Sequence, residues 1–191
     1  MSRLRRLVLL RHGETDGQSS IRFHGKTDVA LSKEGLAQAH TARHALCQEV
    51  FDRVVSSPLQ RAWASALIVT AGAPVELESN FREVDFGRWE GLTAEEIRAR
   101  DPALYERWQA KEPDFEYPGG EMRAHFQARV LAGLARIEHS PSDRVLVVTH
   151  KGVIRTIALQ LLGAPIDEAR LSLGGSVTFT RAPDGGYRLL R

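Results

Sequence analysis

Two stretches of the sequence decide the fold: Leu7-Val8-Leu9-Leu10-Arg11-His12 and Val145-Leu146-Val147-Val148-Thr149-His150. In each stretch an unbroken apolar run leads into a polar pair that ends in histidine. A short apolar run without alternation is typical of a strand that is covered on both faces, as in a parallel sheet. We therefore expect two central strands, each of which ends beside a histidine.

Helical patterns separate these two strands. Ser32 is expected to cap a helix that runs to about Cys47, and Val54-Val55 is expected to form another short strand. Ser57-Pro58-Leu59-Gln60 combines an N-cap serine, a proline at the first helical position and a glutamine at the third. This pattern predicts a helix that begins there, with Arg61 in its first turn.

The second half of the chain continues the alternation. Residues 81–120 are expected to form short helices and loops, with a capping-box pattern at Thr93-Ala94-Glu95-Glu96. Apolar residues at helical spacing predict a long amphipathic helix over 121–139 and a second helix directly after His150. The tail, over 177–190, is expected to form a terminal hairpin.

Strands that alternate with helices favour an α/β fold, here a three-layer α/β/α sandwich with a largely parallel central sheet. A length of 191 residues predicts a single domain over 1–191. Ligands of such folds bind beyond the carboxyl ends of the strands. We therefore expect Arg11, His12 and His150 to meet at one edge of the sheet.

The composition narrows the classes of partner. Hydrophobic residues make up 42% and charged residues 26% of the chain, which is typical of a globular protein. The 26 basic residues are dispersed and nearly balanced by 24 acidic ones, which argues against nucleic-acid binding. No segment approaches the roughly 20 apolar residues of a membrane helix. The single cysteine, Cys47, excludes an internal disulfide and suits a reducing compartment, so we expect a cytoplasmic protein without a membrane partner. The oligomeric state is left open.

Arg11-His12-Gly13-Glu14-Thr15 resembles the signature of the histidine phosphatase superfamily, whose best-known branch is the cofactor-dependent phosphoglycerate mutases. Further stretches look like the landmarks of that family in the right order. They are Arg22-Phe23-His24-Gly25, Asp28 to Gly35, Ser56 to Ala62, Glu83 to Gly91 and Val148 to Arg155. One such motif alone is a weak match, but several in order over nearly the whole chain make coincidence very improbable.

The same residues meet the needs of phosphoryl transfer. A phosphate monoester is a dianion, so its transfer needs fixed positive donors, an in-line nucleophile and an acid for the leaving oxygen. Neutral His12 can act as the nucleophile through one ring nitrogen if the N–H of its other ring nitrogen donates to an acceptor. The resemblance assigns phosphate binding to Arg11 and Arg61, whose planar donors suit a two-pronged contact. A protonated His150 would add a third donor beside the free amides of the following helix, so the scheme needs no metal and no other cofactor.

The resemblance also implies a proton donor, Glu83. It would protonate the departing alcohol and then, as a base, activate the water that hydrolyses phosphohistidine. Asp85 and Glu90 are nearby carboxylates, and sequence spacing leaves the choice among the three open. Glu14 is expected to have a structural role, as an acceptor for an arginine or for backbone amides.

A loop that borders phosphate and substrate is a further implication of the resemblance. Its expected substrate-binding residues are Gly13, Thr15, Gln18, His24 and Gly25. Gln18 stands where many relatives carry asparagine, which moves the amide by one methylene group. Lys151 follows His150 where a small residue is frequent, and it either adds positive charge at the rim or faces solvent.

Together these features predict a metal-independent phosphomonoesterase that acts on a small phosphorylated metabolite through a phosphohistidine on His12. A cofactor-dependent phosphoglycerate mutase is the alternative, but mutases have longer chains and an Arg-x-Tyr pattern after the glutamate, where this chain has Val84-Asp85-Phe86-Gly87. A noncatalytic phosphate-binding module would be expected if a key histidine or arginine were missing. The substrate stays open, because α-ribazole phosphate, sugar phosphates and phosphoglycerates all have family precedent.

Overall fold

The computed structural model describes residues 3–190. Its strands are β1 (Arg6–Arg11), β2 (Arg53–Ser56), β3 (Glu76–Leu77), β4 (Arg144–Thr149), β5 (Ser176–Arg181) and β6 (Tyr187–Leu189). Its α-helices are α1 (Lys33–Ala45), α2 (Gln60–Val69), α3 (Ala94–Arg100), α4 (Pro102–Gln109), α5 (Arg123–Glu138) and α6 (Lys151–Leu162). Three short 3-10 helices are η1 (Ser79–Phe81), η2 (Gly87–Trp89) and η3 (Glu168–Leu171). The alternation of strands and helices that the sequence predicts is confirmed.

The strands form one sheet in the order β3-β2-β4-β1-β5-β6. Strands β1, β2, β3 and β4 pair in parallel, whereas β5 and β6 form an antiparallel hairpin that extends the sheet beyond β1. Arg11 lies opposite Thr149 in the register of β1 and β4. Because both strands end at this level, the two histidines that follow them are brought side by side.

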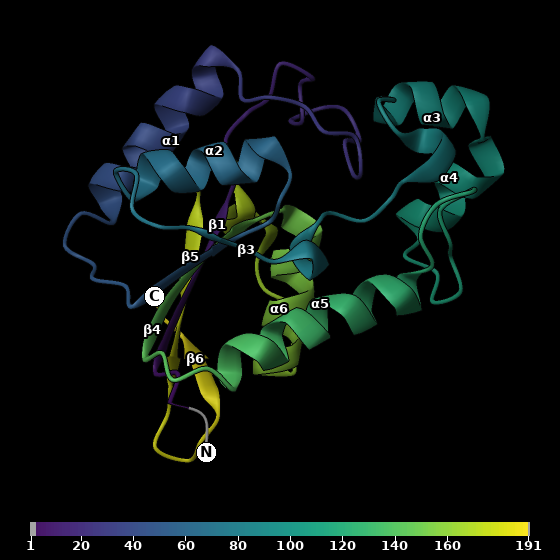
Figure 1. Cartoon of the computed structure of the whole chain (residues 1–191). Helices are drawn as coiled ribbons and strands as arrows, with labels where there is room; N and C mark the ends of the chain where they lie inside the picture. Colours follow the sequence, from purple (N-terminus) through teal and green to yellow (C-terminus); the bar gives the residue numbers. More distant parts are fainter. Residues whose placement is uncertain (1–2, 191) are drawn as a thin grey trace.

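Helices cover both faces of the sheet, as Figure 1 shows. Since side chains alternate along a strand, Val8 and Leu10 of β1 pack with α1 and α2, while Leu7 and Leu9 pack with α5 and α6. Burial on both faces is the physical reason why residues 7–10 of this strand are all apolar. The predicted three-layer sandwich is therefore confirmed.

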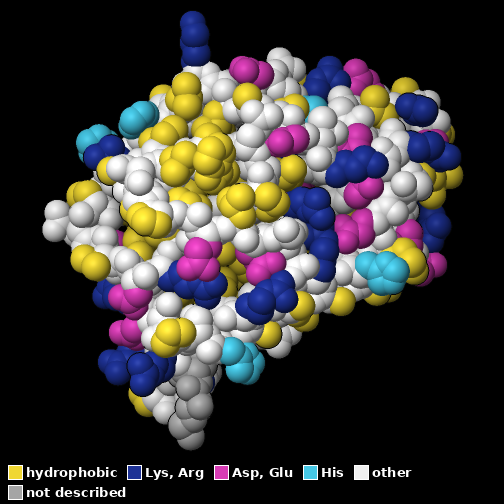
Figure 2. Space-filling view, in the orientation of Figure 1, with side chains coloured by type: hydrophobic (Ala, Val, Ile, Leu, Met, Phe, Trp, Pro, Cys, Tyr) yellow, Lys and Arg dark blue, Asp and Glu magenta, His cyan; other side chains and the backbone are white. Residues whose placement is uncertain are grey.

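The outer surface carries charges of both signs. On the face shown in Figure 2, lysine and arginine side chains are interspersed with aspartate and glutamate, and hydrophobic side chains gather over α2. Within residues 3–190, no helix has the length and apolar character that are needed to cross a membrane.

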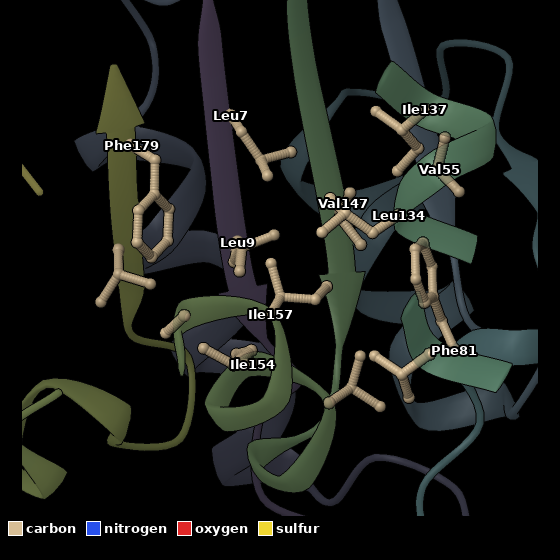
Figure 3. Close-up of a cluster of buried hydrophobic side chains, with 14 of the residues drawn as sticks. Leu7, Leu9, Val55, Phe81, Leu134, Ile137, Val147, Ile154, Ile157 and Phe179 are labelled. Atoms are coloured by element: carbon tan, nitrogen blue, oxygen red, sulfur yellow. The ribbon is translucent and has the colours of Figure 1, made fainter. Parts of the chain in front are cut away.

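The larger hydrophobic core lies between the sheet and the pair α5 and α6. Figure 3 shows Leu9, Val147 and Phe179 of three adjacent strands facing Ile157 of α6. All four side chains are fully buried. Each contributes about 1.5–3 kcal/mol to folding by removal of its apolar surface from water, so the ends of β1 and β4 are held by a well-packed support.

A separate hydrophobic cluster lies beside the main sheet, around η2, α3 and α4. Trp89 is its centre, fully buried, and its indole nitrogen donates a hydrogen bond of 2.9 Å to Asp101. The predicted capping box of Thr93 and Glu96 begins α3, with both reciprocal hydrogen bonds present. This small unit stands at the upper right of Figure 1.

The start of α2 differs from the prediction. The helix begins at Gln60, and its N-cap is Leu59 rather than Ser57. The Ser57 hydroxyl instead lies 2.8 Å from Nε2 of His150, while it accepts a hydrogen bond of 3.3 Å from the Leu59 amide. A partner far away in the sequence therefore replaces the expected cap. Arg61 lies in the first turn of α2, as predicted.

Candidate active site

A cleft of about 680 Å³ opens beyond the carboxyl ends of β1 and β4. Five of the predicted site residues line it: Arg11, His12, His24, Glu83 and Lys151. Arg61 and His150 are fully buried near these residues. Side chains far apart in the sequence thus converge at one edge of the sheet, as expected for an α/β fold.

His12 is buried and held in one orientation at the end of β1. Its Nδ1 lies 2.7 Å from the carbonyl oxygen of Gly13, which is only an acceptor, so Nδ1 carries the proton. The pKa of His12 is held well below its ordinary value, mainly by burial and then by the charges of Arg61 and Arg11. The ring is therefore neutral, and Nε2 presents a free lone pair, as a nucleophile requires.

His150 lies beside His12, with 5.1 Å between the ring centroids. It is the N-cap residue of α6 and is fully buried. Because the Ser57 hydroxyl already accepts the Leu59 amide, its O–H can donate to Nε2 of His150, which leaves the proton on Nδ1. Burial and the charge of Arg61 hold the pKa of His150 well below its ordinary value, so the protonated form that the sequence suggested is disfavoured here.

The two arginines also hold loops in place. Nη1 of Arg61 donates to the Thr27 carbonyl at 2.7 Å, and Nη2 donates to the carbonyls of His24 and Gly25 at 3.1 and 2.7 Å. Nη1 of Arg11 donates to the Leu171 carbonyl at 2.7 Å. The terminal fork of Arg61 is therefore occupied by converging backbone carbonyls, which alters the expected two-pronged contact with phosphate.

Several of the predicted site residues have buried polar atoms without a hydrogen-bond partner. In the described part of the chain, six buried side-chain nitrogen or oxygen atoms have no hydrogen-bond partner. Four of them are Nε of Arg11, Nε of Arg61, Nδ1 of His150 and Nδ1 of His24. An unsatisfied buried polar group costs about 1–3 kcal/mol. The two guanidinium nitrogens and the His150 nitrogen form a set of donors suited to an anion beside Nε2 of His12.

Glu83 presents its carboxylate to the cleft from the segment that follows η1. One carboxylate oxygen accepts the Val84 amide and the other accepts the Gly152 amide, both at 3.0 Å. The Gly152 amide at the start of α6 is therefore taken by Glu83, although the sequence suggested that the helix amides would be free for phosphate. Arg129 donates to the Glu83 carbonyl at 3.0 Å and fixes the backbone.

The other two candidate carboxylates have different partners. Asp85 pairs with Lys26 at 2.9 Å and accepts the Gly87 amide at 2.8 Å. Glu90 accepts the amides of Gly25 and Phe86 at 3.1 and 3.0 Å. Both therefore shape the loops around the cleft, whereas Glu83 faces into it.

The loop after His12 is only partly directed at the cleft. Gly13 packs so closely on α1 that a Cβ atom there would lie 2.4 Å from the Gly35 carbonyl. The Thr15 hydroxyl pairs with Ser19 at 2.8 Å, and Gln18 is exposed with φ 60°. The structure does not bring Thr15 or Gln18 to the cleft. Glu14 accepts the Thr15 amide at 2.8 Å, which matches its expected structural role.

Comparison with known proteins identifies this arrangement. The family model of the histidine phosphatase superfamily, branch 1, matches residues 7–190. The chain belongs to this superfamily. It is 33% identical over 175 residues to the glucosyl-3-phosphoglycerate phosphatase of Mycolicibacterium vanbaalenii, a match that covers 86% of this chain and 77% of the relative. It is 31% identical over 166 residues to phosphoserine phosphatase 1 of Hydrogenobacter thermophilus, with coverage of 85% and 79%.

The solved structures agree with the family. The alpha-ribazole phosphatase of Shigella flexneri superposes with a TM-score of 0.82 at 27% identity, and the match covers 97% of this chain and 95% of the other. The chain is thus a histidine phosphatase in sequence and in fold, and these named relatives are phosphatases of small molecules.

Several residues of this histidine phosphatase line the cleft in addition to the predicted site residues. Trp108 and Tyr117 line the cleft and pack against the small cluster, whereas Trp89 belongs to the core of that cluster. Burial, reinforced by the charge of Glu83, raises the pKa of Tyr117. Arg155 also lines the cleft. Its position one helical turn after Lys151 was the available sequence signal.

The charges that act on His12 belong to side chains of the protein. Within residues 3–190, no group of three or more His, Cys, Asp or Glu side chains is arranged to hold a metal ion. The positive charge near His12 comes instead from Arg11 and Arg61.

Proposed function

We propose that this histidine phosphatase hydrolyses the phosphate monoester of a small metabolite through a phosphohistidine on His12. The observation that carries the proposal is the 2.7 Å contact between Nδ1 of His12 and the Gly13 carbonyl. It fixes the neutral tautomer in which Nε2 is the nucleophile. The family of the chain supports the same reaction class.

In the first step, the lone pair on Nε2 of His12 forms a bond to phosphorus and the bond to the ester oxygen breaks. The unpartnered nitrogens of Arg11, Arg61 and His150 hold the phosphoryl oxygens and stabilise their charge. Glu83, in its protonated form, gives its proton to the ester oxygen, which leaves as an alcohol.

In the second step, the Glu83 carboxylate takes a proton from a water molecule as the water oxygen attacks phosphorus. The bond between phosphorus and Nε2 breaks, and inorganic phosphate forms. Neutral His12 and protonated Glu83 are restored, so one water is consumed in each cycle. The hydrogen bond from Gly152 and the contact with Arg129 support Glu83 in both steps.

A panel of phosphorylated metabolites tests this proposal. Phosphoserine, phosphoglycerates, a sugar phosphate and α-ribazole phosphate would be incubated with the enzyme in excess chelator, and released phosphate would be measured. We expect hydrolysis of at least one compound at a rate that the chelator does not change, and none by His12→Ala. A requirement for added magnesium, or no hydrolysis of any compound, would overturn the proposal.

A further inference from the structure

Two cations line the cleft next to the catalytic histidines. Lys151 directly follows His150, and Arg155 is four residues later on the same face of α6. Both side chains line the same cleft as His12. The charge of Arg155 also acts on Arg11, which places it within electrostatic reach of the expected phosphate position.

Glu168 binds both of these cations. One of its carboxylate oxygens lies 2.7 Å from Nζ of Lys151 and 2.5 Å from Nη2 of Arg155, and the other accepts a hydrogen bond of 2.6 Å from Nε of Arg155. Partial burial would raise the pKa of Glu168, but the hydrogen bonds from Arg155 and Lys151 outweigh it and lower the pKa to about 2. The pair of cations therefore already coordinates an ionised carboxylate.

This carboxylate is placed where it can be displaced. Residues 163–170 are exposed except for Ile166, and the Glu168 side chain keeps 52% of its surface accessible. Among the residues that the structure describes, Lys151 and Arg155 line the cleft, whereas Glu168 does not. Exposed ion pairs contribute little to folding, and α6 is anchored instead by the buried residues Ile154 and Ile157. Release of Glu168 therefore leaves the core intact.

We propose that Lys151 and Arg155 form a subsite for a carboxylate group on the alcohol part of the substrate, and that Glu168 occupies this subsite until the substrate binds. The proposal rests on the proposed function, because it takes the phosphate to lie at His12. A guanidinium beside an ammonium suits a carboxylate, since the guanidinium offers paired planar donors. Phosphate esters of alcohols that carry a carboxylate are therefore preferred over otherwise identical esters of alcohols that carry no charge.

A matched pair of ligands tests the subsite by equilibrium binding. 3-Phosphoglycerate and glycerol 3-phosphate differ only in a carboxylate that replaces a hydroxymethyl group. Calorimetry with the His12→Ala variant measures their affinities without turnover. We expect 3-phosphoglycerate to bind at least about 10-fold more tightly, as for hydrogen bonds to a charged group. Lys151→Met and Arg155→Met should each remove most of this preference.

Two further variants sharpen the test. Glu168→Gln removes the internal competitor, so it should tighten binding of 3-phosphoglycerate by about 5-fold, the scale of an exposed ion pair, and leave glycerol 3-phosphate unchanged. Lys33→Met, which removes an exposed lysine at the start of α1, should keep the full preference. This control separates the subsite from a general effect of net charge.

Three results would overturn the subsite. They are equal affinity for the two ligands, an equal loss of both affinities in Lys151→Met, and unchanged binding of 3-phosphoglycerate in Glu168→Gln. Hydrolysis assays with the wild-type enzyme keep the two proposals distinct. Turnover of both esters without any binding preference refutes the subsite alone. Absence of turnover refutes the proposed function, while the binding measurements still decide the subsite.

Discussion

The backbone amide of Gly152 donates a hydrogen bond of 3.0 Å to the carboxylate of Glu83. The first amides of a helix have no partner within it, so Glu83 satisfies one of those at the start of α6. The same helix has His150 as its N-cap. One element therefore sets the positions of both His150, the proposed hydrogen-bond donor to phosphate, and the Glu83 carboxylate, the proposed proton donor to the leaving group.

Gly152→Ala should disturb Glu83 while the fold is kept. A Cβ atom at this position would lie 2.3 Å from a Glu83 carboxylate oxygen, so the carboxylate must move. A displacement of about 1 Å can reduce the rate by about 100-fold, and we expect a loss of this order in kcat for an alkyl phosphate. Steady-state kinetics check it, with thermal unfolding as a control for stability. The double variant Gly152→Ala/Glu83→Gln should have the same kcat as Glu83→Gln alone, because the effect of Gly152→Ala acts through Glu83. A further loss of kcat in the double variant would contradict this.

The leaving group should report which carboxylate donates the proton. Glu83→Gln should strongly slow alcohol release from an alkyl phosphate, because an alkoxide leaves poorly without a proton. Release of para-nitrophenolate should suffer less, since it leaves readily without help. Single-turnover measurements on both substrates avoid the later hydrolysis step. Asp85→Asn is the matched control, because Asp85 pairs with Lys26 instead of facing the cleft. If Asp85→Asn instead slowed alcohol release from the alkyl phosphate alone, Asp85 rather than Glu83 would be the proton donor.

The two buried histidines should make the fold sensitive to mild acid. Their pKa values lie well below 6.5 in the folded protein because of burial, so protonation favours the unfolded chain. Stability is therefore full above pH 6.5 and falls as the pH drops below that value. Between pH 7.5 and 5.5, we expect a loss of about 1.4 kcal/mol in the free energy of unfolding for each histidine.

Urea denaturation at the two pH values measures this loss. The share of one histidine should disappear in His12→Gln and that of the other in His150→Gln, because neither variant can bind the proton. Glu168 titrates far below this window, at about 2, and does not contribute. An unchanged pH dependence in both variants would show that other groups cause it.

Much of the fold follows from local patterns in the sequence. The unbroken apolar runs in β1 and β4 predict strands covered on both faces, and the capping box at Thr93 begins α3 where expected. The start of α2 could not be predicted in the same way. Ser57 bonds to His150, a residue 93 positions away, and no local pattern records such a partner.

The candidate site likewise contains features that local sequence patterns predict and features that they do not. The motif around His12 predicts residues that gather at one edge of the sheet, because strand ends fix their positions. The hydrogen bonds of Arg61 to three loop carbonyls, and the pairing of Lys151 with Glu168, depend on how distant segments pack. The different surroundings of Glu83 and Asp85 also depend on this packing, because Glu83 lines the cleft whereas Asp85 pairs with Lys26.

Trapping of the covalent intermediate tests the central claim most directly. Enzyme mixed with radiolabelled substrate would be quenched in base within one turnover, and the labelled peptide would be mapped. We expect acid-labile phosphate on His12, formed faster than the overall rate, and no label in His12→Ala. Phosphorus NMR of the denatured labelled enzyme should place the phosphate on Nε2, because Nδ1 is held by the Gly13 carbonyl. Label on another residue, phosphate on Nδ1, or full turnover by His12→Ala would contradict the account.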